Sequence, residues 1–181
     1  MLPPAEIPQE LLRRARAGDS AAFRALVESL SGLTYNLAWR ITGVAADAED
    51  LSQEVFLKLH RNFAVYDPRL PFMPWFRKLT TNVCLNWLRA RNARRERPLG
   101  EGDVPAPETA LPGEPSAVLR RAMDALPPEY RLVLARFYLE QLGVGEIAAA
   151  MDVPAGTIKT WLFRAREELK NKLLPHVENL F

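Results

Sequence analysis

The chain has 181 residues, enough for one large domain or two small ones. Hydrophobic residues make up 48% of it and charged residues 25%, a globular composition that excludes wholesale disorder. The single cysteine, Cys84, excludes a disulfide framework and a cysteine-based zinc cluster, and His60 and His176 show no metal-ligand spacing. No stretch is apolar enough for a signal peptide or a membrane span, so we expect a soluble, cytoplasmic protein without metal ion or cofactor.

The net charge of +2 conceals an uneven distribution along the chain. Residues 1–95 carry 14 basic and 9 acidic residues, residues 96–115 carry one and five, and residues 116–181 carry 9 and 8. A basic front half, an acidic connector and a basic stretch near the end suit the binding of a polyanion. Ordinary solvated helix faces would explain the same counts.

The N-terminal part predicts helices separated by short turns. A short first helix ends at Gly18, and Asp19 or Ser20 caps a second, whose apolar residues recur at helical spacing until Gly43 ends it. Asp47 is the predicted N-cap of a third helix, with further acidic residues in its first turn.

A loop is predicted over residues 63–73, which contain the prolines Pro68 and Pro71. Pro74 then opens a fourth helix, because proline suits the first turn. Residues 96–115 hold five prolines, three glycines and five acidic residues, so they predict an extended linker.

Beyond the linker, residues 116–126 and 129–139 predict two short helices. No segment alternates like a strand for long enough to build a sheet. The sequence therefore predicts an all-α fold of two small helical domains, with the boundaries 1–95, a linker 96–115, 116–174 and a tail 175–181.

Residues 141–173 contain the most informative pattern. A helix with three consecutive alanines is followed by the turn 152–154 and by a second, basic helix, which is a helix-turn-helix pattern. In that motif the second helix enters the major groove of DNA and reaches base edges. An ordinary helical hairpin with a solvated basic face is the alternative. With Ile158, Leu162, Ala165 and Leu169 facing inward, the side chains left for a partner are those of Thr157, Lys159, Thr160, Phe163 and Arg164, followed by Arg166 and Lys170, which can reach phosphates.

Residues 47–63, DAEDLSQEVFLKLHRNF, combine an apolar face with a polar stripe. Leu51, Val55 and Leu59 supply the buried face of the predicted helix. The polar stripe opposite consists of Asp50, Gln53 and Glu54. Taken alone, these acids fit the start of a helix, where they oppose its dipole.

This segment resembles the core-polymerase-binding helix of bacterial sigma factors of the extracytoplasmic-function class (group 4 of the sigma-70 family). Residues 66–95 are similar to the promoter-melting and −10-reading region of that class. The segment EIAAAMDVPAGTIKTWLFRAREEL resembles its −35-reading region. The motifs stand in the family's order over roughly residues 10–95 and 116–174.

The resemblance implies a dissociable subunit that gives RNA polymerase its promoter specificity and is not itself an enzyme. Its implied partners are the polymerase core (the β′ clamp helices and the β flap), promoter DNA both duplex and single-stranded, and an anti-sigma factor, with no membrane. Contacts to the clamp helices are implied for Asp50, Leu51, Gln53, Glu54 and Phe56. Contacts to the single-stranded −10 element are implied for Tyr66, Asp67, Arg69, Trp75, Arg77, Lys78 and Asn82, with the loop 66–69 holding a flipped base. Contacts to the −35 duplex are implied for Thr157, Lys159, Thr160, Phe163 and Arg164.

The chemistry of the −10 segment suits this assignment. Melted bases need aromatic faces to stack on and a cationic track for the backbone. Phe72, Trp75 and Phe76 interleave with arginines and a lysine. Aromatic side chains at helical spacing are also typical of a core, and we expect one of Trp75 and Phe76, first of all Phe76, to be buried.

The chain departs from the family pattern at three places. The loop Tyr66-Asp67-Pro68-Arg69 stands where the family often has Phe-x-Gly followed by an acid, and proline fixes a φ angle that glycine leaves free. Trp161 replaces a small polar or basic residue, and Asn86 stands where many members have aspartate.

Two other functions fit parts of the sequence. A stand-alone helix-turn-helix regulator explains residues 129–173 but leaves the segment 47–63 and the acidic linker without a role. A helical hydrolase or nuclease would need paired carboxylates and a metal ion. Glu49, Asp50 and Glu54 are the only dense acids, and they lack a histidine or a second cluster.

Overall fold

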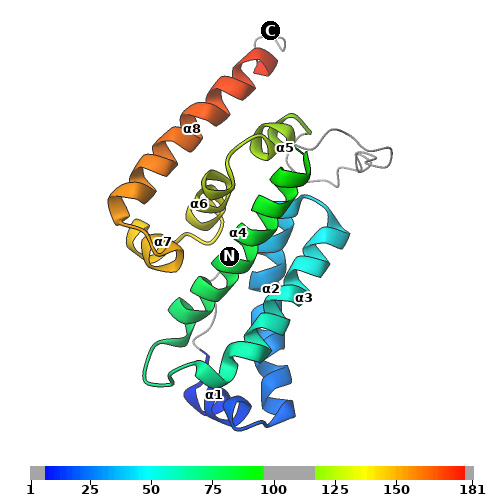
Figure 1. Ribbon diagram of the computed structural model, residues 1–181, viewed down its shortest axis with the longest axis vertical. Coiled ribbons are helices and arrows are strands. Elements are labelled where there is room, and N and C mark those ends of the chain that lie inside the picture. The colour runs from blue at the N-terminus through cyan, green and yellow to red at the C-terminus, as the bar shows by residue number, and fades with distance from the viewer. Residues whose placement is uncertain (1–6, 96–116, 178–181) are drawn as a thin grey trace.

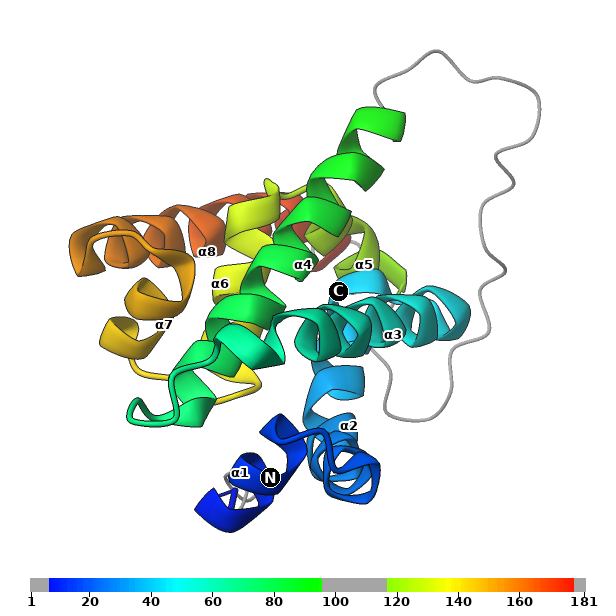
Figure 2. The ribbon, with the colours of Figure 1, turned by 60° about the horizontal axis from the view of Figure 1, so that its bottom comes forward.

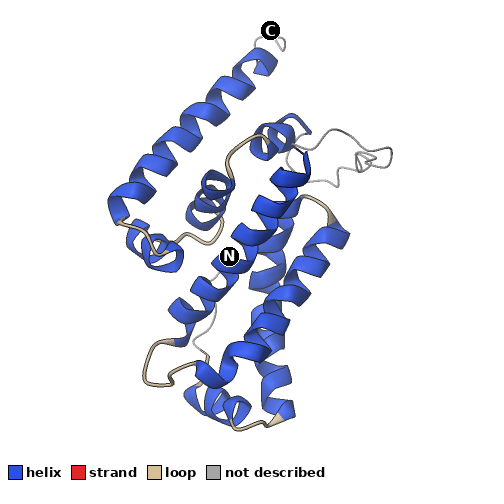
Figure 3. Cartoon of the chain, viewed as in Figure 1, coloured by secondary structure: helices blue, strands red, loops and turns tan. Residues whose placement is uncertain are grey.

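The structure is a computed structural model that describes residues 7–95 and 117–177 (Figure 1). Within these ranges all regular elements are helices, as the sequence predicted (Figure 3). The N-terminal half contains α1 (Gln9–Arg16), α2 (Ser20–Thr42), α3 (Ala45–Asn62), the 3-10 helix η1 (Phe63–Val65) and α4 (Phe72–Arg95). The C-terminal half contains α5 (Ala117–Asp124), α6 (Pro128–Tyr138), α7 (Val144–Met151) and α8 (Ala155–Val177). The predicted linker lies outside the described residues.

The ends of α2 follow the predicted signals. The Asp19 carboxylate accepts hydrogen bonds from the N–H groups of Ala21 and Ala22 at 3.0 Å each, so it satisfies two of the donors that a helix start leaves unpaired. Gly43 ends the helix with φ +69°, a left-handed conformation that costs glycine little.

Two helices begin earlier than predicted, α3 by three residues and α4 by two. Helix α3 begins at Ala45 after an extended Val44, so Asp47 lies in the first turn and is not the N-cap. Helix α4 begins at Phe72 and contains Pro74 in its first turn, where no N–H donor is needed. Phe72 is 4% exposed, and its burial anchors the start of α4 ahead of the proline.

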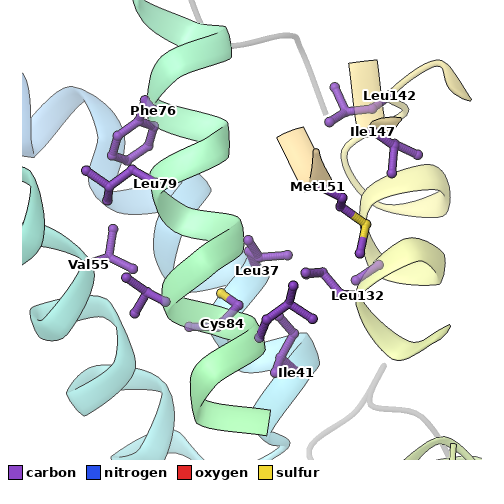
Figure 4. Close-up of a cluster of buried hydrophobic side chains, with 14 of the residues drawn as sticks. Leu37, Ile41, Val55, Phe76, Leu79, Cys84, Leu132, Leu142, Ile147 and Met151 are labelled. Carbon is purple, nitrogen blue, oxygen red and sulfur yellow. The ribbon is translucent and has the colours of Figure 1, made fainter. Parts of the chain in front are cut away.

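One continuous apolar core runs through both halves of the molecule. Figure 4 shows Leu37 of α2 and Phe76 of α4 in the same cluster as Leu132 of α6 and Met151 of α7. Phe76 is 1% exposed, as expected for one of the two adjacent aromatic residues. Helix α4 is the central element, because it packs against α3 on one side and against α6 and α7 on the other (Figure 2).

Two buried arginines of α6 join the halves. Arg136, 1% exposed, donates from Nη1 to both carboxylate oxygens of Glu140 at 2.7 Å. Its Nη2 donates to the hydroxyls of Thr80 and Thr81 on α4, at 2.7 and 2.9 Å. Arg131 donates to a main-chain oxygen at the end of α2. The sequence predicted these helices but not this contact, since nothing local marks an arginine for burial.

Candidate functional site

The exposed face of α3 carries the predicted polar stripe. Asp50, Gln53 and Glu54 are all exposed. Leu57, which follows them at helical spacing, is 57% exposed, so the stripe includes an apolar side chain that the sequence analysis missed. Its position seven residues after Asp50 could have revealed it.

Two other residues predicted for this surface lie differently. Leu51 is 1% exposed and belongs to the core, so its side chain is not accessible to a partner in this structure. A side chain that packs against α2 and α4 cannot also face outward from α3, and the apolar period had placed it inside. Phe56 is half-buried at the edge of the core and keeps part of its ring accessible.

A pocket of about 340 Å³ lies between α3 and α4, and we call it the α4 pocket. Three of the residues predicted for the −10 strand line it together: Trp75, Lys78 and Asn82. They share one side of the helix because they are three and four residues apart. Four polar residues that the sequence analysis did not assign to it also line the pocket, namely Glu54, Lys58, Asn62 and Asn86, and its apolar lining is Val65, Leu79 and Val83.

The residues from α3 could have been found by their spacing. Glu54, Lys58 and Asn62 are four residues apart and therefore lie along one line of the helix. The sequence does not show that this line of side chains on α3 faces α4. Glu54 consequently lies where the exposed stripe of α3 meets the α4 pocket.

Arg77 is not brought into the α4 pocket. It projects from a different side of α4, where its Nη1 donates to Glu146 Oε1 of α7 at 2.9 Å. Its side chain is only 17% exposed. Lys78, at the rim of the pocket, is 48% exposed and forms an ion pair of 3.1 Å with Asp152.

The loop 66–71 differs most from its predicted role. Tyr66 is 1% exposed, with its ring stacked on Phe63 at 6.0 Å and its hydroxyl donating to Leu70 O at 2.6 Å. In this conformation the Tyr66 ring therefore faces the core, and its implied contact with DNA stays a prediction that needs the loop to move. Burial raises the pKa of its phenol. Nothing in the sequence indicates that the ring turns inward, because the loop has no periodicity.

Asp67 and Arg69 of this loop pair with each other. Arg69 Nη2 lies 2.7 Å from Asp67 Oδ2, while the Arg69 side chain is 87% exposed. Hydrogen bonds from the Arg69 side chain and backbone hold the pKa of Asp67 below its usual value. The loop therefore presents the exposed guanidinium of Arg69, whose charge is already partly balanced by the Asp67 carboxylate.

Helices α7 and α8 form the predicted helix-turn-helix. The turn begins at Asp152, whose φ of +59° ends α7 in the left-handed region. Ile158, Leu162 and Ala165 are buried, as predicted, and Thr157 is half-buried. The exposed side of α8 carries Lys159, Thr160, Phe163 and Arg164. Phe163 is 65% exposed, a large apolar surface in the middle of a basic face.

Two further residues of α8 make contacts inside the protein. Trp161 is partly buried and packs against the core, which accounts for a large side chain at this position. Arg166 lies over the rings of Phe137 and Tyr138 and donates to the Tyr138 hydroxyl at 2.8 Å. The predicted reach of Arg166 to a phosphate is therefore not seen.

A second, larger cavity of about 520 Å³ lies between the end of α2 and helices α5, α6 and α8. Its lining is mainly apolar and includes Trp39, Leu139 and Leu169, with Arg40 and Lys170 among its charged residues. We call it the interdomain groove. Of the residues predicted to contact DNA, Arg166 and Lys170, which were expected to reach phosphates, line this groove.

The described residues, 7–95 and 117–177, contain no cluster of three His, Cys, Asp or Glu side chains suited to a metal ion. Over the same ranges, no helix combines the length and the apolar character needed to cross a membrane. Cys84 is buried, and burial raises the pKa of its thiol to about 12, so the thiol stays protonated and unreactive at neutral pH.

Residues 26–94 match the family model of Sigma-70 region 2, and residues 116–169 match that of Sigma-70, region 4. The ECF RNA polymerase sigma factor SigE of Mycolicibacterium smegmatis is 34% identical over 88% of this chain and 65% of its own length. The RNA polymerase sigma-H factor of Pseudomonas aeruginosa is 30% identical over 94% of this chain and 95% of its own. The ECF RNA polymerase sigma factor SigW of Bacillus subtilis is 28% identical over 90% and 94%.

Solved structures with a similar fold include two complexes. CnrH in complex with the cytosolic domain of CnrY gives a TM-score of 0.62 at 22% identity, over 91% of this chain and 96% of that one. The sigma factor RpoE in complex with the anti-sigma factor NepR from Bartonella quintana gives 0.61 at 18% identity, over 83% and 96%. At these identities the likeness concerns the fold.

Proposed function

The chain belongs to the sigma-70 family of RNA polymerase sigma factors, in its extracytoplasmic-function class, and on that premise we propose how its surfaces divide the recognition of polymerase and promoter. It is a promoter-specificity subunit of RNA polymerase and not an enzyme. The observation that carries this function is the presence of both regions, in order, in one chain. A stand-alone DNA-binding regulator would leave region 2 without a role. Because its polymerase works in the cytoplasm, we infer the same location for this chain.

The exposed stripe of α3 is the proposed binding surface for the polymerase core. Asp50, Gln53 and Glu54 offer carboxylates and an amide, and Leu57 adds an exposed apolar surface beside them. A polar rim around an apolar anchor is the usual composition of a protein interface. The proposed partner of this stripe is the clamp-helix coiled coil of the β′ subunit, with the β flap contacted by the C-terminal half.

The α4 pocket is the proposed site for one base of the single-stranded −10 element. Trp75 supplies an aromatic face for stacking, and Lys78 a cation for the phosphate at the rim. The amides of Asn82, Asn62 and Asn86 each carry donors and an acceptor, which is what reading a base edge requires. Asp67 and Arg69 remain candidates for contacts outside the pocket, whereas Tyr66 contributes only by shaping the loop.

Replacing Asn82 by alanine is expected to change base preference without changing the fold, because Asn82 is exposed. The loss of one amide that reads a base should reduce discrimination by ~1 kcal/mol or more, about fivefold to tenfold. The measurement is the affinity of the full chain for single-stranded −10 oligonucleotides varied one base at a time. Lys78→Ala should instead weaken binding to all of them, in a salt-dependent way.

Asn92→Ala is the matched control for this prediction. Asn92 lies on the same helix but outside the α4 pocket. Its variant should keep the preference profile of the parent protein. An unchanged profile for Asn82→Ala, with helicity intact, would remove Asn82 from the site.

The exposed face of α8 is the proposed reader of the −35 duplex. Lys159, Thr160, Phe163 and Arg164 lie along one side of the second helix of the motif, near its N-terminal end, where base edges are read. Thr157 is half-buried at the start of the helix and can still contact a phosphate through its hydroxyl. Trp161 supports this face from within the core.

Arg164→Ala is expected to cost ~1–3 kcal/mol on the preferred −35 duplex and to relax the choice of base at one position. Lys159→Ala should weaken binding to all duplexes and lower the slope of affinity against salt by about one unit, as loss of a phosphate contact does. Duplex-binding titrations at several salt concentrations separate the two effects. If Arg164→Ala binds as tightly as the parent protein, α8 is not placed as proposed.

An anti-sigma factor is the proposed regulator. Support comes from the fold, which is similar to that of RpoE in its complex with the anti-sigma factor NepR. The interdomain groove suits an amphipathic helix with acidic flanks, because its lining is apolar and its edge carries Arg40 and Lys170.

The proposed function is tested by mixing the purified chain with core RNA polymerase and separating the complex by gel filtration. The chain should co-elute with the core in a one-to-one ratio and should be displaced by another sigma factor of the same class. Failure to bind the core under conditions in which a known sigma factor binds would contradict the proposal.

A further inference from the structure

The interdomain groove has the size and the position of a small-molecule site. It holds about 520 Å³, and its walls come from the end of α2, from α5 and α6, and from the C-terminal half of α8. Helix α6 packs against both α2 and α8, and α5 packs against α8, so the walls support one another (Figure 1). Small-molecule sites occupy roughly 300–1,000 Å³ and are often found where two parts of a chain meet.

The walls of the groove are mainly aliphatic. Side chains that are half-buried and therefore still accessible inside it are Leu119, Met123, Leu139, Leu169 and Leu173. An apolar ligand that covers such side chains removes them from water, which is favourable. Leucine and methionine side chains also adjust to a flexible chain, because they are not planar. The interior of the groove therefore suits an aliphatic chain.

The volume favours a small ligand inside the groove. An α-helix is about 10–12 Å wide, so two turns of it fill about 850 Å³ or more. This exceeds the 520 Å³ of the groove. A helix laid across the groove could insert only some of its side chains, whereas an alkyl chain can enter whole.

The charges around the groove are unbalanced. Its lining contains one acid, Asp124, and five basic residues, which are Arg40, Arg120, Arg131, Arg166 and Lys170. The acid already forms an ion pair of 2.8 Å with Arg131. A positive potential at an apolar cavity favours a ligand that carries a negative charge.

Arg40 and Lys170 are the cations best placed to hold an anionic group. Both side chains are exposed, Arg40 in the last turn of α2 and Lys170 on α8. Neither forms an ion pair within residues 7–95 and 117–177. They can therefore bind a carboxylate without first giving up another partner. Arg166, by contrast, donates to the Tyr138 hydroxyl.

We propose that the interdomain groove binds one molecule of a long-chain carboxylate, with the alkyl chain along the aliphatic walls and the carboxylate at Arg40 and Lys170. This inference goes beyond the proposed function and does not depend on it. The α3 stripe, the α4 pocket and the exposed reading residues of α8 all lie outside the groove.

The first test is calorimetric titration of the full chain with dodecanoate, below the concentration at which it forms micelles. We expect saturable one-to-one binding. Decanoate, which is two methylenes shorter, should bind about 15-fold more weakly, because each methylene that leaves water contributes about fourfold in affinity. Dodecyltrimethylammonium has the same chain length with a cationic head, and it should bind at least about tenfold more weakly than dodecanoate.

The second test replaces the two cations. Arg40→Ala/Lys170→Ala should weaken dodecanoate binding about three- to tenfold, since contacts of exposed charges are screened by water and salt. The matched control is Arg24→Ala/Lys172→Ala, which removes two exposed cations of the same two helices that do not line the groove. The control should bind dodecanoate as the parent protein does. Helicity by circular dichroism should be the same for all three proteins.

A third variant, Leu169→Trp, fills the groove with a larger side chain and should lower the affinity more than about tenfold. Should it lose helicity, the two double variants still decide, because they change only exposed side chains. No saturable binding of dodecanoate, equally tight binding of dodecyltrimethylammonium, or equal losses in both double variants would overturn the inference. Each of these results would leave the proposed function intact, because binding to core polymerase is measured without the carboxylate.

Discussion

Replacing Arg136 by alanine is expected to lower the free energy of unfolding by about 3–5 kcal/mol. The guanidinium is 1% exposed and pairs with Glu140, whose side chain is 5% exposed. Without Arg136 that carboxylate is a buried charge with no cation beside it, and the Thr80 and Thr81 hydroxyls of α4 lose their donor. Thermal unfolding should show a melting temperature roughly 6–20 °C lower, given 2–4 °C per kcal/mol in a chain of this size.

Two comparisons make this prediction specific. Arg136→Met combined with Glu140→Leu should recover most of the loss, because apolar residues of similar volume replace buried ion pairs at little cost. Arg13→Ala, which breaks an exposed pair with Glu10, should change stability much less. A loss below about 1 kcal/mol for Arg136→Ala would mean that water already reaches Glu140.

Asp50→Lys is expected to weaken binding to core RNA polymerase by about 2 kcal/mol or more, which is roughly 30-fold. Asp50 is exposed at the start of the α3 stripe, and its replacement puts a positive charge where a carboxylate meets the partner. The fold should be nearly unaffected, with a change in unfolding free energy under about 0.5 kcal/mol. Titration of labelled core polymerase measures the first quantity, and thermal unfolding the second.

Glu28→Lys provides the matched charge reversal for this experiment. Glu28 is exposed on α2, outside the α3 stripe. Its variant should bind core polymerase as the parent protein does. Equal losses for both variants would indicate a general electrostatic effect, and a large loss of stability in Asp50→Lys would mean that the stripe is structural.

The fold could be predicted from the sequence as far as single helices go. Apolar spacing located the helices, and Asp19 and Gly43 marked the ends of α2 because capping is a local interaction. Where a helix starts without a side-chain cap, as α3 does at Ala45, the predicted start was three residues too late. The closed contact between the halves was not predictable, since α6 and α4 are far apart in the sequence and Arg136 carries no mark of burial.

The candidate site was also predictable where it depends on one helix, and not where it depends on how helices pack together. The exposed residues of α3 and α8 were predicted because a helix period separates inner from outer faces. The apolar pattern placed Leu51 on the buried face of α3, whereas the resemblance implied a contact with a partner. In the structure Leu51 is buried. The burial of the Tyr66 ring could not be predicted, because a loop has no period. The direction of the Arg77 side chain could not be predicted either, because it depends on which neighbour covers each side of α4.

The most direct test of the account is transcription in vitro by core RNA polymerase with the purified chain, on a library of randomised promoters. We expect the chain to confer initiation on core polymerase, and the selected promoters to share two elements, one upstream read through α8 and one downstream read through the α4 pocket. Arg164→Ala should alter only the upstream preference, and Asn82→Ala only the downstream one. No initiation above that of core polymerase alone, or selection of a single element unaffected by Asn82→Ala, would contradict the account.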